Sequence, residues 1–114
     1  MKIVGTGSCL PQRVVSNDDL AAIMDTSDEW ISSRTGIRNR HIATTETTTS
    51  LACDAVKSAL QYAGIDGSEI DLIIAASVST DKIVPSLACQ IQAEIGAGSA
   101  VAFDINAACS GFLF

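Results

Sequence analysis

The sequence is poor in several kinds of residue, and each shortage excludes a class of protein. Two prolines among 114 residues exclude a collagen-like chain, and a hydrophobic content of 47% excludes a disordered one. No apolar run approaches the roughly 20 residues that a membrane-spanning helix needs. Basic residues are few, with seven Lys and Arg against thirteen Asp and Glu, which gives a net charge of −6. Neither nucleic acid nor an anionic membrane is therefore an expected partner.

Closely spaced metal ligands are also missing. His41 is the only histidine, and no two cysteines form a C-x-x-C pair, so the sequence predicts no zinc or other metal site. Residues 1–7 contain no apolar signal-peptide core before their glycines, so we expect a cytoplasmic protein with free thiols. The four cysteines are Cys9, Cys53, Cys89 and Cys109.

Capping residues followed by apolar residues at helical spacing predict four helices. Residues 16–19 begin the first, and Thr26 is the expected N-cap of a second helix that ends at Gly36. A third helix follows a polar loop, with one apolar face between residues 51 and 63 and Gly64 at its end. Residues 85–96 predict the fourth, with Pro85 in its first turn.

Apolar stretches between these helices predict strands at residues 2–4, 37–42, 70–79 and 101–105. Residues 70–79 include five consecutive apolar residues with no charge among them, a pattern typical of a strand buried on both faces in a parallel sheet. Strands that alternate with helices predict an α/β class with parallel pairing.

Cys109 is the strongest candidate for a reactive group. It follows a predicted strand, at the expected start of a helix, among small residues that leave room for a substrate. Backbone N–H groups and the positive end of a helix favour a thiolate, which suits acyl transfer through a thioester. The alternative is that Cys109 is a buried, unreactive thiol.

Two other features are weaker candidates. Gly5 and Gly7 resemble half of a dinucleotide-binding fingerprint, but Leu10 occupies the place of its third glycine, so a tight loop is the better interpretation. His41 lies beside Arg40, where a neighbouring cation disfavours a second positive charge, and we interpret it as structural.

Six stretches, in this order, resemble β-ketoacyl-acyl-carrier-protein synthase III, the condensing enzyme that begins bacterial type II fatty acid synthesis. They are residues 3–7, 26–31, 34–38, 40–43, 85–92 and 103–112. The resemblance implies the thiolase fold, in which two similar α/β halves pack as a dimer. Residues 1–114 are then expected to be an incomplete N-terminal thiolase-like domain, part of the first half, with a mixed, mostly parallel sheet flanked by helices. On this expectation the domain is cut just after the nucleophile turn, and the apolar residues 112–114 agree with such a cut.

The resemblance also implies a two-step reaction without a cofactor other than the coenzyme A thioester substrate. Cys109 takes an acyl group, usually acetyl, from acyl-coenzyme A, and its backbone N–H forms part of the oxyanion hole. Malonyl-acyl carrier protein then loses carbon dioxide and attacks the thioester to give a 3-oxoacyl-carrier protein. The family's partner histidine and asparagine lie in the second half, so residues 1–114 alone are expected to be inactive in condensation.

The resemblance assigns further residues to substrate binding. Trp30 stacks on the adenine of coenzyme A, Arg34 lies near its phosphates, and Thr26 can hydrogen-bond the base. Val84 lines the acyl pocket across the interface of a homodimer. From the residues alone, the favoured interpretation is that Trp30 packs in the core and Arg34 is a solvated surface charge.

Two alternatives to this function remain open. One is another ketosynthase or a hydroxymethylglutaryl-coenzyme A synthase of the same fold, which shares the cysteine turn but differs in its partners. The other is a non-catalytic binding or assembly module, although an apolar end at residues 112–114 is unusual for a self-sufficient module.

Overall fold

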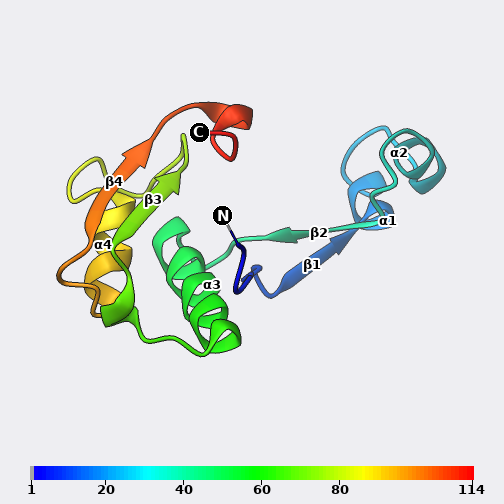
Figure 1. The fold of residues 1–114 in the computed structure, drawn as a ribbon. Helices are drawn as coiled ribbons and strands as arrows, with labels where there is room; N and C mark the ends of the chain where they lie inside the picture. The colour runs from blue at the N-terminus through cyan, green and yellow to red at the C-terminus, as the bar shows by residue number, and fades with distance from the viewer. Residues whose placement is uncertain (1) are drawn as a thin grey trace. The chain divides into compact units, whose positions relative to one another are not determined.

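The computed structural model describes residues 2–114, which form two compact units. Unit 1 comprises the described residues up to Cys9 together with Thr47–Phe114, and unit 2 comprises Leu10–Glu46 (Figure 1). No helix in the described chain has the length and apolarity needed to cross a membrane.

Unit 1 combines two helices with a parallel pair of strands. Its elements are α3 (Thr48–Ala63), β3 (Leu72–Ala76), α4 (Leu87–Glu94), β4 (Val101–Ile105) and two short 3-10 turns, Gly67–Glu69 and Ala108–Ser110. β3 and β4 pair in parallel, from Leu72 opposite Val101 to Ala76 opposite Ile105. The predicted α/β class with parallel pairing is thus confirmed for this unit.

Local capping determines where α3 begins and ends. The Thr47 hydroxyl accepts the Ser50 N–H and the Ser50 side chain accepts the Thr47 N–H, which is a capping box. Gly64 ends the helix with φ of 67°, a left-handed conformation that favours glycine. The predicted helix and its end are confirmed, and its first turn includes polar residues that were expected to be loop.

Two aspartates from distant parts of the chain cap the helices of unit 1. The Asp81 carboxylate accepts the backbone N–H groups of Thr48 at 3.0 Å and Thr49 at 2.7 Å, at the first turn of α3. Hydrogen bonds from Thr49, the largest contribution, lower the pKa of Asp81 to about 2. In the same way, Asp104 on β4 accepts the N–H groups that begin α4. The starts of both helices therefore have tertiary contacts in addition to their local caps.

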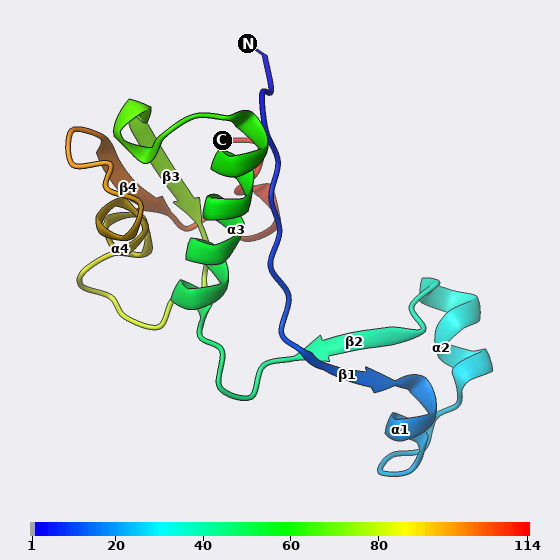
Figure 2. The ribbon, with the colours of Figure 1, turned by 90° about the horizontal axis from the view of Figure 1, so that it is seen from below.

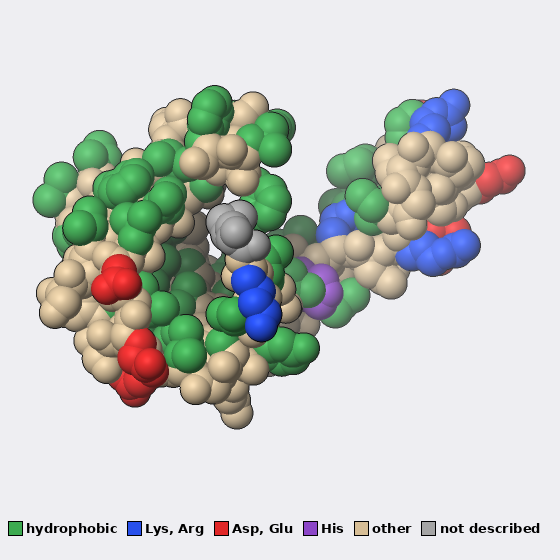
Figure 3. Space-filling model, viewed as in Figure 1, with side chains coloured by type: hydrophobic (Ala, Val, Ile, Leu, Met, Phe, Trp, Pro, Cys, Tyr) green, Lys and Arg blue, Asp and Glu red, His purple; other side chains and the backbone are tan. Residues whose placement is uncertain are grey.

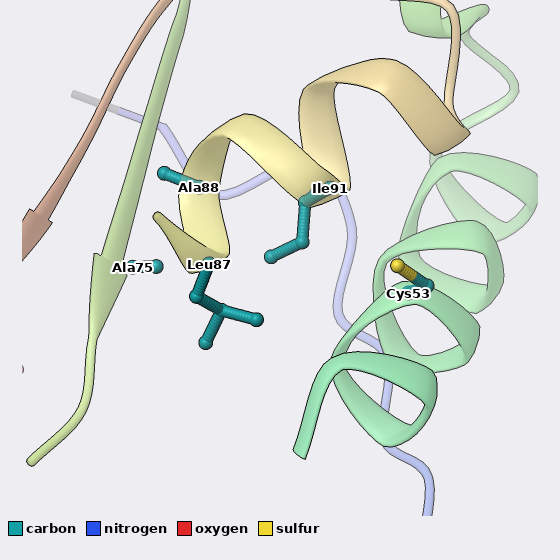
Figure 4. Packing of buried hydrophobic residues seen from close by; sticks show 5 residues of the cluster. All are labelled: Cys53, Ala75, Leu87, Ala88 and Ile91. Atoms are coloured by element: carbon teal, nitrogen blue, oxygen red, sulfur yellow. The ribbon is translucent and has the colours of Figure 1, made fainter. Parts of the chain in front are cut away.

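The core of unit 1 is small and lies around α4. Figure 4 shows α4 between β3 and α3, with five buried residues contributed by the three elements. They are Cys53, Ala75, Leu87, Ala88 and Ile91. α4 begins at Leu87 with Ser86 as its N-cap and ends at Glu94, so the prediction that Pro85 lies inside its first turn is wrong.

The prediction that residues 70–79 form a strand buried on both faces is also wrong. β3 is shorter, and Leu72 and Ile74 are 50% and 45% exposed. On β4, Val101 and Phe103 are likewise exposed. Figure 3 shows hydrophobic side chains gathered over this part of unit 1. The helices cover only one face of the two-stranded sheet, so the other face is open.

The segment 2–9 packs closely on α3 without forming the strand predicted at residues 2–4. A Cβ built on Gly5 would lie 2.6 Å from the carbonyl oxygen of Ala59. A Cβ built on Gly7 would overlap the carbonyl oxygen of Ala55. Figure 2 shows the segment running alongside α3. The absence of two side chains therefore allows backbone to approach backbone, and the segment shows no turn at these glycines, where a tight loop was predicted.

Unit 2 is a two-stranded antiparallel ribbon with two helices at one end (Figure 1). Its elements are β1 (Arg13–Ser16), α1 (Asn17–Ala21), α2 (Asp28–Thr35) and β2 (Asn39–Ile42). The strand predicted at residues 37–42 is confirmed as β2, whereas β1 was not predicted. Ser27, not Thr26, is the N-cap of α2, because its hydroxyl accepts the Trp30 N–H. Gly36 ends α2 with φ of 73°, as predicted.

Candidate functional site

Cys109 lies just beyond the carboxyl end of β4. The last pair of the parallel register is Ala76 with Ile105, so both strands end at the same edge of the sheet. Gly111 is buried against the end of β3, and a Cβ added to it would lie 2.7 Å from the Cβ of Ala76. The turn that carries Cys109 is thereby held at the sheet edge where parallel α/β folds place their ligands.

The backbone around Cys109 is a tight turn and not the start of an α-helix. Ala108–Ser110 is a single 3-10 turn, closed by hydrogen bonds from Ser110 N–H to Ala107 O at 2.9 Å and from Gly111 N–H to Ala108 O at 3.0 Å. Ala108 has φ of 43°, a left-handed conformation that costs on the order of 1 kcal/mol for a residue with a Cβ.

The four thiols differ in accessibility, and all are free. Within these 114 residues Cys109 is exposed. Cys53 is buried in the core, where desolvation raises its pKa. Cys9 and Cys89 are partly buried. Since the thiolate is the nucleophile, Cys109 is the cysteine best placed to react with a bulky substrate.

Trp30 and Arg34 form a stacked pair on α2. They lie four residues apart, on the same face of the helix, and the Arg34 guanidinium carbon is 4.6 Å from the centre of the indole ring. Trp30 is 54% exposed, so it is not a core residue. The pair presents an indole surface beside a cation, a combination suited to a base and a phosphate.

Two adjoining hollows in unit 2 share Trp30 and Ser27. The larger, about 370 Å³, is lined by Asp25, Thr26, Ser27 and Trp30. The smaller, about 280 Å³, extends along α2 to Arg34. Thr26 and Arg34 thus lie in neighbouring hollows that meet at Trp30.

Val84 belongs to the exposed loop between β3 and α4 and is itself 81% exposed. Its own unit does not enclose it, so the acyl-pocket prediction remains untested. A separate hollow of about 570 Å³ lies between α3 and β3, and its lining is almost wholly aliphatic. It offers no group for acid–base or nucleophilic chemistry.

Asn17 is a functional candidate that the sequence analysis missed. It is the largest fully buried side chain of the described chain, with 1% exposure, and it hydrogen-bonds groups at both ends of α2. In the sequence it reads as an ordinary residue of a helix start, because its partners lie 11 to 23 residues away. Among residues 2–114, no group of three or more potential metal ligands comes together.

Comparison with known proteins gives close matches along nearly the whole chain, although no family model matches. A β-ketoacyl-[acyl-carrier-protein] synthase III of Streptococcus sanguinis is 55% identical over 113 residues, which is 99% of this chain and 35% of that protein. A Streptococcus pneumoniae protein of the same name is also 55% identical. The chain spans about a third of the length of these curated relatives.

Solved structures agree with these relatives. The 3-oxoacyl-[acyl-carrier-protein] synthase III of Aquifex aeolicus superposes with a TM-score of 0.93 at 53% identity, covering 98% of this chain and 36% of that one. A priming β-ketosynthase of the R1128 polyketide pathway superposes with a TM-score of 0.92 at 41% identity, covering 97% and 34%.

The fold and the cysteine turn thus resemble about one third of a ketosynthase-type condensing enzyme. Within that class, the chain is a partial homologue of β-ketoacyl-[acyl-carrier-protein] synthase III.

Proposed function

We propose that this chain carries the acyl-accepting half of a synthase that begins fatty acid chains. Cys109 takes an acyl group, acetyl in the simplest case, from acyl-coenzyme A. The thiolate sulfur attacks the thioester carbon, the new carbon–sulfur bond forms, and the coenzyme A thiolate leaves and takes up a proton. The observation that carries the proposal is an exposed cysteine on a strained turn at the sheet edge, within a match of 55% identity.

The second step uses malonyl-acyl carrier protein as the other substrate. Loss of carbon dioxide leaves the electron pair on the α-carbon, which attacks the acyl thioester of Cys109 and releases the cysteine thiolate. The product is a 3-oxoacyl-carrier protein. The family resemblance assigns this step to a histidine and an asparagine of the second half, so condensation needs residues beyond these 114.

The hollows of unit 2 support a coenzyme A site. Adenine stacks on the exposed indole of Trp30, Thr26 hydrogen-bonds the base, and Arg34 neutralises phosphate charge. Val84, which no residue of its own unit covers, lines the acyl pocket of a partner subunit in a cytoplasmic homodimer. In this proposal, residues 1–114 form an incomplete thiolase-like domain.

A priming ketosynthase of a polyketide pathway is the second candidate, because one such enzyme superposes almost as well. The identity of 41% against 53% to 55% favours the fatty acid enzyme. Both candidates share the Cys109 loading step and differ in the acyl groups and carrier proteins that they accept.

The test uses a graft in which this chain replaces the 113 aligned residues of the Streptococcus sanguinis synthase. We expect the graft to take up label from radiolabelled acetyl-coenzyme A and to form 3-oxoacyl-carrier protein with malonyl-carrier protein. Cys109→Ser abolishes the labelling, whereas Cys9→Ser, at a partly buried thiol outside the turn, retains it. Undiminished label on the Cys109→Ser graft would remove this sulfur from the reaction.

A further inference from the structure

Helix α2 carries the proposed nucleotide-binding residues but has almost no apolar anchor. None of its eight residues is buried, and Trp30 is more than half exposed. A surface helix normally stays in place by burying one apolar face, and an eight-residue helix is too short to be stable alone. Something else must therefore hold α2 in position.

The amide of Asn17 contacts the chain at both ends of α2. Its Nδ2 donates to Oδ1 of Asp28 at 2.8 Å, and Asp28 is the first residue of the helix. The same nitrogen donates to the carbonyl oxygen of Ile37, also at 2.8 Å. Ile37 directly follows Gly36, the residue that caps the carboxyl end of α2. One side chain thus bridges the two ends of the helix.

Asn17 is itself fixed to the β1–β2 ribbon. Its Oδ1 accepts a hydrogen bond of 2.6 Å from Nη2 of Arg40 on β2, and its backbone N–H donates to the carbonyl oxygen of Arg38. Both amide hydrogens and the amide oxygen are therefore used, in a site with 1% exposure. A buried amide with every bond made fixes orientation strongly, since loss of a partner leaves a buried polar group unsatisfied.

A further polar contact, between α2 and the residue that precedes β2, is weak by comparison. Arg38 and Asp28 form an ion pair at 3.8 Å, with side chains that are 75% and 40% exposed. Pairs as exposed as this contribute little, because water screens them and the arginine loses side-chain freedom. The buried amide is the stronger restraint on the helix.

We propose that Asn17 is the positioning residue of the nucleotide site: its amide clamps both ends of α2 to the ribbon and so sets where Trp30 and Arg34 lie. This inference rests on the proposed function for its consequence, which is tighter binding of coenzyme A. The clamp itself is a property of unit 2 and is measurable without any ligand.

The first experiment measures amide hydrogen exchange in the unliganded chain. In Asn17→Ala, we expect the Ile31 and Gly36 amides, which close the ends of α2, to exchange about tenfold faster. The amides of the β1–β2 ladder should change less than twofold. Asp19→Asn is the matched control, because the side-chain hydrogen bonds of Asp19 go to Ser16 at the start of α1 and none to α2.

The second experiment follows coenzyme A binding by quenching of Trp30, the chain's single tryptophan. We expect Asn17→Ala to weaken binding about tenfold, and Asp19→Asn to leave it within twofold. The exchanged pair Asn17→Asp with Asp28→Asn reverses donor and acceptor across one contact, and should recover part of the affinity that Asn17→Asp alone loses. This rescue separates positioning from a general loss of stability.

Hydrogen exchange tests whether Asn17 clamps α2, and coenzyme A binding tests whether that clamp matters for recognition. Unchanged exchange in α2, or equal acceleration throughout residues 10–46, would overturn the clamp whether or not coenzyme A binds. Equal coenzyme A affinity in the unaltered chain and Asn17→Ala would overturn its role in recognition. Failure of the unaltered chain to bind coenzyme A would count against the proposed nucleotide site alone, and hydrogen exchange would still decide the clamp.

Discussion

Replacement of Asp104 by asparagine tests whether a tertiary cap holds α4 beside the cysteine turn. Asp104 lies on β4, five residues before Cys109, and its two carboxylate oxygens accept the Leu87 N–H at 2.9 Å and the Ala88 N–H at 2.7 Å. Leu87 and Ala88 are also core residues. The carboxylate therefore joins the helix end, the core and the strand that leads to the candidate nucleophile.

The expected loss in the free energy of unfolding follows from the two hydrogen bonds that Asp104 accepts. Asparagine keeps one acceptor oxygen, so one of the two N–H groups loses its partner, at about 1–3 kcal/mol for a group withdrawn from water. Loss of the negative charge at a helix N-terminus adds about 0.3–1 kcal/mol. Since Asp104 is only half-buried, water offsets part of this, and we expect the free energy of unfolding to fall by about 1.5–2.5 kcal/mol.

The assay is urea unfolding followed by circular dichroism, with Asp71→Asn as the matched control. Asp71 is exposed and immediately precedes β3, and only its backbone carbonyl takes part in the sheet contacts. The control should change the free energy of unfolding by less than about 0.5 kcal/mol, as surface substitutions usually do. An Asp104→Asn effect no larger than the control would refute the reasoning that this carboxylate holds the helix end.

Three further outcomes follow from the geometry of unit 1. Gly5→Ala should destabilise the chain by at least about 1 kcal/mol in urea unfolding, because its Cβ would lie 2.6 Å from a carbonyl oxygen of α3, whereas Gly98→Ala, with no atom within 4 Å, should not. The pKa of Asp81 is lowered to about 2, so its stabilising effect is fully present above pH 4 and is lost as the pH falls toward 2. Asp81→Asn should flatten that part of the curve of stability against pH, and an unaltered curve would contradict the cap. Iodoacetamide should modify exposed Cys109 at least tenfold faster than buried Cys53, as measured by peptide mass spectrometry, and equal rates would contradict the difference in burial.

The ends of α2 and α3 were predictable because their causes are local in the chain. The left-handed glycines 36 and 64 act through neighbouring residues, so the pattern identifies them directly, whereas the Thr47–Ser50 capping box lies in a polar segment for which no particular cap was predicted. The choice of Thr26 over Ser27 as an N-cap was wrong by one residue, since either hydroxyl fits the pattern and only the backbone geometry selects one.

The candidate site likewise has residues that the sequence identified and backbone features that only the structure revealed. Cys109, Trp30 and Arg34 were found from residue type and from resemblance to a family, and the stacking of Trp30 with Arg34 follows from their helical spacing. The left-handed backbone at Ala108 and the 3-10 turn were not predictable, because a residue with a Cβ rarely adopts that conformation and nothing in the local sequence marks it.

The sequence by itself therefore determined the parallel pair β3 and β4, the presence of the four helices and the glycines that end α2 and α3, all of which depend on composition, periodicity and near neighbours. Only the tertiary structure decided which carboxylates cap α3 and α4 and which amide holds α2. Those partners lie 11 to 33 residues apart in the chain, and a polar group acquires its role only when folding removes water and brings a partner within hydrogen-bonding distance.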